Sequence, residues 1–288
     1  MKKIIGSLIV MALLPVALMV GCNGSIPSSP KSSGGMTPTQ TVTSTPRLTP
    51  TITPTNLNGY TSTPTITSTP QTAQAPLTLN TAGNYSVMAA SKITDAGEIL
   101  CGDIGEFPGS TITGVVYTFA ATCSSSVANI GTAPASIAQA ALTLAYNDAR
   151  GRLNAVPIPT VAVGDMGGQA IPPGLYYSGS TIGITGAVTL DGNGVTNPVF
   201  IFQIGSGLTT ATGSQVVLKG TATAANVYWQ VGSSATLGPS SSLVGTILAY
   251  TSITLNTGAT LNGQALAMGG GAVGGAVVFD GSNTVIAP

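Results

Sequence analysis

The stretch that decides the fold is Thr257-Gly258-Ala259-Thr260-Leu261-Asn262-Gly263, a threonine-rich turn that returns in variant form along the chain. The variants read Thr212-Gly213-Ser214-Gln215, Pro239-Ser240-Ser241-Ser242 and, far upstream, Pro108-Gly109-Ser110-Thr111-Ile112-Thr113-Gly114. A short unit that recurs at intervals of roughly 20 residues is typical of a chain wound into stacked coils. Stacking places equivalent residues in rows about 4.8 Å apart. We therefore expect a mainly β chain that forms a right-handed parallel β-solenoid.

A second repeat strengthens this prediction. Phe202-Gln203-Ile204-Gly205-Ser206 returns 27 residues later as Trp229-Gln230-Val231-Gly232-Ser233, and each copy leads into a Ser/Thr-rich turn. The alternative all-β architecture is a β-sandwich, but the strands of a sandwich would not repeat their turns in register.

One helix is predicted over about 136–150. Ser136 and Gln139 have the spacing of a capping box, and small apolar residues then recur at helical intervals. Gly151 provides a stop, and Arg150 lies in the last turn, where the helix dipole favours a cation. The apolar face consists mostly of alanine, which suits close packing along the wall of a sheet.

Residues 1–22 have the pattern of an export signal. Lys2 and Lys3 precede an apolar run, which ends in Leu18-Met19-Val20-Gly21-Cys22. This ending resembles a lipobox, although Met19 stands where leucine is usual. We expect Cys22 to be lipidated and the protein to be extracellular or at the cell surface, held to the membrane by the lipid. The alternative is an ordinary secretory signal with an unrelated cysteine.

The remaining chain divides into a linker and one folded domain. Residues 23–76 are rich in threonine and proline and lack an apolar pattern, so we expect a disordered, extended spacer. Residues 77–288 are long enough to form a single domain with a sizeable core. Within this domain, Cys101 and Cys123 are the only cysteines. In an exported chain they are expected to form a disulfide, the alternative being two buried free thiols.

The composition excludes several classes of function. Charged residues make up 6% of the chain, and there is no histidine, so no Ser-His-Asp triad or Cys-His pair can form. Residues 77–288 hold four basic and eight acidic residues, a net charge of −4, which argues against nucleic-acid binding. The acidic residues Asp95, Glu98, Asp103 and Glu106 lack the basic and aromatic surroundings of a glycosidase site. We therefore expect no catalytic residues, no enzymatic activity, no metal and no cofactor.

What remains is an array of hydroxyl groups. Aligning the coils by their turns pairs the following candidate ligand-contact residues: Ser110 and Thr111, Thr212 and Ser214, Ser240 and Ser242, Thr257 and Thr260. In such an array the threonine methyl resists wetting while the hydroxyl anchors one water. The alternative interpretation is that Ser and Thr are simply common in the strands and turns of exported solenoids.

Several longer stretches together resemble the microbial ice-binding proteins of the DUF3494 type. They span residues 102–114, 138–149, 172–176, 198–206, 229–238, 245–249 and 252–263. The resemblance implies a discontinuous β-solenoid of triangular section, with one long helix alongside and ice bound by one flat face. Thr257-Gly258-Ala259-Thr260 fits the Thr-Ala/Gly-x-Thr/Asn motif that some members carry on that face.

The resemblance thus implies an ice-binding, antifreeze protein whose partner is the ice crystal, and we expect it to act as a monomer. The alternative is a surface adhesin that binds polysaccharide or a neighbouring cell through the same solenoid. A glycan binder would usually present aromatic platforms. The aromatic residues of the domain, however, have the pattern of core or edge packing: Tyr176, Tyr177, Tyr228, Trp229 and Tyr250.

Overall fold

The computed structural model describes residues 73–288 except 116–117, 120–122, 124–125, 161 and 270–273. The chain divides into two units, 1–63 and 64–288, and all described residues belong to the second. The predicted signal peptide (1–22), the predicted lipidation site Cys22 and nearly all of the predicted linker (23–76) lie outside the described residues. Among the helices that are described, none is long and apolar enough to cross a membrane.

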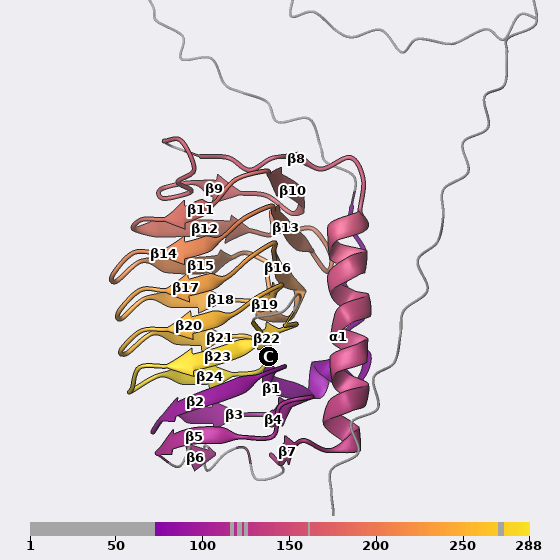
Figure 1. The fold of residues 1–288 in the computed structure, drawn as a ribbon. Coiled ribbons are helices and arrows are strands. Elements are labelled where there is room, and N and C mark those ends of the chain that lie inside the picture. Colours follow the sequence, from indigo (N-terminus) through magenta and orange to yellow (C-terminus); the bar gives the residue numbers. More distant parts are fainter. Residues whose placement is uncertain (1–72, 116–117, 120–122, 124–125, 161, 270–273) are drawn as a thin grey trace, which may run out of the picture. The chain divides into compact units, whose positions relative to one another are not determined.

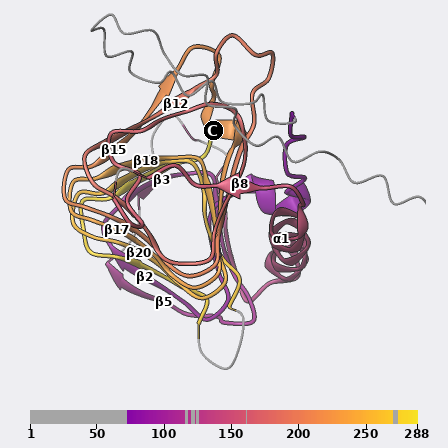
Figure 2. The same ribbon diagram turned by 90° about the horizontal axis from the view of Figure 1, so that it is seen from above.

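The folded unit is a three-sided solenoid with one helix beside it (Figures 1 and 2), as predicted. Three parallel sheets form its sides, and successive coils of the chain pass through sheets C, A and B in turn. In spatial order, sheet A contains β7 (Ala128–Ile130), β4 (Asp103–Glu106), β1 (Tyr85–Ala89), β22 (Ala265–Ala267), β19 (Thr246–Ala249), β16 (Val227–Val231), β13 (Phe200–Ile204), β10 (Gly174–Ser178) and β8 (Val156–Pro157). Sheet B contains β11 (Ile182–Ile184), β14 (Leu208–Thr210), β17 (Ala235–Leu237), β20 (Ile253–Leu255), β23 (Ala276–Phe279), β2 (Lys92–Ala96) and β5 (Ile112–Val115). Sheet C contains β6 (Thr118–Phe119), β3 (Ile99–Cys101), β24 (Thr284–Ile286), β21 (Thr260–Asn262), β18 (Ser242–Val244), β15 (Gln215–Lys219), β12 (Ala187–Asp191) and β9 (Ala170–Ile171).

The solenoid is discontinuous along the chain. The N-terminal strands β1 and β2 pair with β22 and β23, and β3 pairs with the last strand, β24. The N-terminal coils therefore stack directly on the C-terminal coils and extend the same solenoid. In Figure 1 the indigo N-terminal strands lie directly below the yellow C-terminal ones. The two ends of the domain thus stabilise each other through parallel pairing over a long sequence separation.

The repeats seen in the sequence occupy equivalent places. Phe202 pairs with Trp229 and Gln203 with Gln230 in adjacent strands of sheet A. Inside the coils the rings of Phe202 and Trp229 stack with centroids 4.2 Å apart, and Tyr176 continues the stack 5.4 Å from Phe202. The indole nitrogen of Trp229 donates a 2.8 Å hydrogen bond to the Val244 carbonyl. The Tyr176 hydroxyl donates to the Pro172 carbonyl at 2.6 Å, so the stack fills the interior with aromatic rings and leaves both of its polar groups hydrogen-bonded.

The turns from sheet B to sheet C explain the recurrent glycine. Gly213 and Gly258 have φ values of +67° and +72°, and Ser240 adopts +54° at the equivalent place. Only glycine adopts this left-handed conformation without steric cost, so the repeat preserves a turn geometry.

The helix α1 (Ala133–Gly151) runs along sheet A and is longer than predicted. It begins at Ala133 rather than at about 136, so Ser136 lies inside the first turns and does not cap them; Thr132 is the N-cap residue. Pro134 explains the early start, because proline is favourable in a first helical turn, where its missing N–H is not needed. Alanines of α1 pack with residues of sheet A in a second core outside the coils. Two short 3-10 helices, η1 (Asn80–Asn84) and η2 (Ala224–Asn226), complete the fold.

The predicted disulfide is present. Cys101, at the end of β3, is bonded to Cys123, with the two Cα atoms 5.4 Å apart. The bond joins β3 to a residue that precedes β7 and α1 in the sequence.

Candidate functional site

One outward position of every strand in sheet B falls into a single row. The strands are paired in register, so this position is continuous from β11 to β5. Threonine occupies five of its seven places: Gly183, Thr209, Thr236, Thr254, Val278, Thr94 and Thr113. We call this set the threonine row. Its members recur at the strand spacing of about 4.8 Å.

The local sequence explains why the threonines point outward. In β20, for example, Ile253 and Leu255 are fully buried inside the coil and Thr254 between them is not. Successive side chains of a strand alternate between its two faces, so an apolar-Thr-apolar triplet must turn its threonine away from the core. Because most of these strands have only three residues and end in tight turns, the outer face stays short and regular.

The hydroxyls of the threonine row are available to external groups. Within the described part of the chain, no hydrogen bond uses the side-chain oxygens of Thr209, Thr236, Thr254 or Thr94. Thr113 differs, because its hydroxyl oxygen is buried. Four rigid threonines therefore present both a methyl and an unpaired hydroxyl to the surroundings.

A second outward rank lies two residues before the threonine row in each coil, at or next to the start of each strand of sheet B. Its residues are Thr181, Gly207, Ser234, Ser252, Ala276, Lys92 and Thr111. All except Lys92 are small and uncharged. The face is therefore nearly neutral, and no large side chain stands between the threonines.

The eight residues selected from the sequence do not form one surface. Thr212, Ser240 and Thr257 lie on exposed turns at the edge between sheets B and C, while Ser242 and Thr260 belong to β18 and β21 of sheet C. Ser110 and Thr111 lie instead between β4 and β5, at the edge between sheets A and B. The alignment that matched Ser110 and Thr111 with the other turns is therefore wrong. It relied on similar composition, but this turn connects sheets A and B, whereas the other turns connect sheets B and C.

Several of these hydroxyls already hold the turns together. Ser214 is 1% exposed and donates to the Ala211 carbonyl at 2.8 Å, so it cannot contact a ligand. Thr257 donates to the carboxylate of Asp280 at 3.1 Å, one coil away. The recurrent turn is thus in part a structural feature that connects neighbouring coils.

Sequence reasoning missed the threonine row itself. Its signal was available as a repeated triplet of apolar, Thr and apolar or small residue, as in Ala235-Thr236-Leu237, Ile253-Thr254-Leu255 and Ile112-Thr113-Gly114. The turns gave the stronger pattern because they are longer than these triplets and contain more Ser and Thr.

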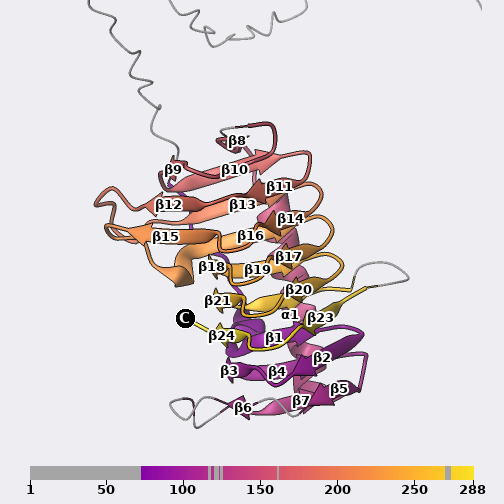
Figure 3. The same ribbon diagram turned by 90° about the vertical axis from the view of Figure 1, so that its left-hand side faces the viewer.

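The other two sides of the solenoid are less suited to a flat contact. Sheet A is covered by α1 along its outer surface (Figure 2). On sheet C, the segments that follow β12 and β15 project from the stack (Figure 3), and Lys219 and Asp191 form an ion pair at 2.8 Å beside them. Sheet C also mixes polar residues with exposed Val217, Ile99 and Ile286. Sheet B is the regular face.

The carboxylates at the N-terminal end of the domain have structural partners. Glu106 is fully buried and accepts the Thr111 backbone N–H at 3.0 Å, and Glu98, 1% exposed, accepts the Ala96 N–H at 2.8 Å. Asp103 accepts the Val127 N–H at 2.9 Å. Among the described residues no three His, Cys, Asp or Glu side chains are grouped as a metal site would require.

Comparison with known proteins identifies a matching family and related proteins. A family model described as "Ice-binding-like" matches residues 87–274. An ice-binding protein from Nostoc sp. (strain HG1) is 38% identical over 194 residues, which cover 67% of this chain and 69% of the relative.

Two solved structures show the same fold. The crystal structure of an ice-binding protein from an Antarctic biological consortium is 40% identical, with a TM-score of 0.68 over 77% of this chain and 96% of that one. The crystal structure of an ice-binding protein from the Antarctic ascomycete Antarctomyces psychrotrophicus is 33% identical, with a TM-score of 0.67 over 74% of this chain and 99% of that one.

Proposed function

Because this chain belongs to the ice-binding-like family, we propose that it is an antifreeze protein that adsorbs to ice through sheet B. The observation that carries this assignment is the threonine row, whose unpaired hydroxyls lie in register on a rigid face. The exposed turn residues Thr212 and Thr257, together with Thr111 on the opposite edge, border that face and extend it.

The chemistry of threonine suits contact with ordered water. Each methyl group resists wetting, and each free hydroxyl anchors one water molecule. The backbone ladder holds these groups at a constant spacing, so ordering the water between them costs little entropy. A charged surface would instead bind its own hydration shell strongly, and Lys92 is the only charged residue in the two outward ranks of the face.

Adsorption by itself explains an effect on ice growth. Molecules attached to a growing front force the ice to advance between them with a curved surface. Curvature makes further growth less favourable, so growth or recrystallisation slows. The protein catalyses no reaction in this proposal, and each molecule acts as a monomer.

We also propose that the domain is displayed outside the cell. The pattern of residues 1–22 supports export, Cys22 supports a lipid anchor, and the Thr/Pro composition of 23–76 supports an extended spacer. At about 3.1 Å per residue in the polyproline II conformation, a spacer of this length reaches on the order of 150 Å. Such a tether would keep sheet B clear of the membrane and free to meet ice.

Partition into ice tests the proposal directly. The purified chain, in dilute solution, is exposed to a slowly growing ice hemisphere, with a protein of similar size and no ice affinity as the control. We expect the chain to be enriched in the ice fraction and the control to be rejected into the liquid. Rejection of the folded chain with the control would refute ice binding.

A further inference from the structure

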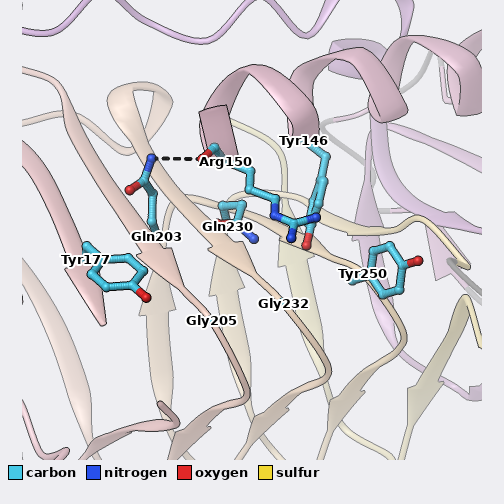
Figure 4. Close-up of a pocket in the computed structure, with 8 residues that line it drawn as sticks. All are labelled: Tyr146, Arg150, Tyr177, Gln203, Gly205, Gln230, Gly232 and Tyr250. Atoms are coloured by element: carbon cyan, nitrogen blue, oxygen red, sulfur yellow. Dashed lines mark hydrogen bonds between the residues drawn. The ribbon is translucent and has the colours of Figure 1, made fainter. Parts of the chain in front are cut away.

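A pocket on the helix side of the solenoid has a different character from sheet B. It encloses about 490 Å³ and lies between the C-terminal half of α1 and sheet A. Its lining combines tyrosines, glutamines and one arginine: Tyr146, Arg150, Tyr177, Gln203, Gln230 and Tyr250. Figure 4 shows Tyr177 and Tyr250 at opposite ends, with Arg150 and both glutamines between them.

The coil register makes the pocket a linear site. Tyr177 pairs with Gln203, and Gln203 with Gln230, in the adjacent strands β10, β13 and β16, and Tyr250 follows β19 in the next coil. Tyr177, Gln203 and Gln230 therefore form a line with intervals of about 4.8 Å along the solenoid axis. Gln230 pairs with the buried Leu248 in the next strand, and Tyr250 lies two residues beyond Leu248. A ligand that follows this line must be extended and must repeat on a similar scale.

Tyr177 differs from the aromatic residues of the core because its ring is not buried. The core assignment from the sequence is confirmed for Tyr176, Tyr228 and Trp229, which are at most 3% exposed. Tyr177, in contrast, is 51% exposed, so it does not lie in the core. Its neighbour Tyr176 faces the coil interior, and strand alternation turns Tyr177 outward. An exposed aromatic ring beside a polar pocket offers a stacking surface.

Arg150 provides an unpaired positive charge. Among the described residues, no ion pair or hydrogen bond engages its guanidinium group, whereas Arg152 two residues later is held by Asp148 at 2.9 Å. The pocket lining contains no carboxylate that could neutralise it. A planar guanidinium is well matched to a carboxylate, which it can bind through two parallel hydrogen bonds.

The remaining polar groups are pre-arranged. Gln203, 7% exposed, donates through Nε2 to the carbonyls of Ala149 at 2.8 Å and Arg152 at 2.9 Å, and so fixes the end of α1 against the sheet. Gln230 is 3% exposed and lies in the next strand. The walls of the pocket are therefore rigid, and binding would require little reorganisation.

The pocket lies at the C-terminal end of α1, and this position limits which ligands can bind. The C-terminal end of a helix carries partial negative charge, which disfavours a phosphate or another highly charged anion. Amide groups and tyrosine rings suit a hydroxyl-rich ring compound, and the single arginine suits one carboxylate. We propose that this pocket binds an acidic oligosaccharide, an extended chain of neutral sugars that carries one uronic acid, independently of the ice-contact face.

Binding of a matched pair of tetrasaccharides to the full chain tests the proposal. The first is a neutral trisaccharide that carries one terminal glucuronic acid; the second is the same tetrasaccharide with its carboxyl group methyl-esterified, which keeps the rings and removes the charge. Isothermal titration at low salt should show the acid form binding at least about tenfold more tightly than the ester, as expected for a charge-assisted pair.

Variants identify the residues that carry the binding. Arg150→Gln should abolish the preference for the acid form, whereas Lys219→Gln, which removes the same charge from sheet C, should preserve it. Tyr177→Ala should weaken both tetramers by about fivefold, and Tyr177→Phe should retain binding because the ring remains. Ice recrystallisation inhibition should be unchanged in Arg150→Gln.

Three results would overturn the proposal: no binding of either tetramer to the folded chain, equal binding of both, or an acid preference that survives Arg150→Gln. None of them would affect the assignment of the ice-contact face, which depends on sheet B alone.

Discussion

A tyrosine in the middle of the threonine row should disable ice binding without unfolding the protein. Thr254 is the best position, because it lies between Thr236 and Val278 in register and its hydroxyl has no partner among the described residues. Thr254→Tyr places an aromatic ring above a face whose neighbouring strands are only about 4.8 Å apart, so the ring also shields the adjacent members of the threonine row.

The size of the effect follows from the contacts that are lost. One threonine contributes about 0.8 kcal/mol for its buried methyl group and about 1 kcal/mol for its hydrogen bond. Loss of a single threonine contact therefore weakens adsorption by more than about tenfold, and loss of three adjacent contacts by considerably more. Stability should change by about 0.5 kcal/mol or less, because position 254 faces outward and tyrosine is favourable in strands.

The assay is inhibition of ice recrystallisation by the purified protein, with folding checked by circular dichroism and urea unfolding. Thr284→Tyr is the matched control, since Thr284 occupies an outward position of sheet C. Thr257→Tyr tests the turn at the edge between sheets B and C. We expect Thr254→Tyr to require at least about tenfold more protein to arrest coarsening, Thr284→Tyr to match the unmodified chain, and Thr257→Tyr to lie between them. Full activity of a folded Thr254→Tyr variant would refute the assignment to sheet B, and a larger loss in Thr257→Tyr would move the site to the turns.

Three further predictions concern stability. Replacing both Cys101 and Cys123 with serine removes a cross-link over a sequence separation of 22 residues, and the free energy of unfolding in urea should fall by about 3 kcal/mol; an unchanged midpoint would show that the bond is dispensable. Trp229→Ala removes a fully buried ring from the aromatic stack and should cost about 3–5 kcal/mol in the same measurement, a loss below about 1 kcal/mol being incompatible with this packing. The hydrogen bond from the Thr185 hydroxyl holds the pKa of Asp165 below its usual value, so this carboxylate stabilises the fold near neutral pH and its contribution disappears as the pH falls below about 4. Asp165→Asn should therefore be less stable than the unmodified chain at pH 7, and the difference should shrink as the pH falls below about 4; a difference that does not depend on pH would contradict the prediction.

Local patterns in the sequence determined the class of fold. The recurrent turn, the repeated Phe-Gln-Ile and Trp-Gln-Val segments and the small apolar face of the helix each describe one coil or one element, and each depends on neighbouring residues only. The disulfide could be predicted for a similar reason, since the domain contains only Cys101 and Cys123. The start of the helix was missed because the capping pattern at Ser136 and Gln139 outweighed the simpler signal of Pro134.

The site required the tertiary structure. Whether Thr94 and Thr254 share a face depends on β2 pairing with β23, a contact between opposite ends of the domain that no local pattern encodes. Similar turns at Ser110 and Thr257 lie at different edges of the solenoid. Which edge a turn occupies depends on which two sheets it connects, and the composition of the turn does not show this. The sequence by itself therefore determined that the chain winds into coils rich in threonine. Only the closure of those coils decided which threonines align, because parallel register is a property of the stacked backbone and not of any single repeat.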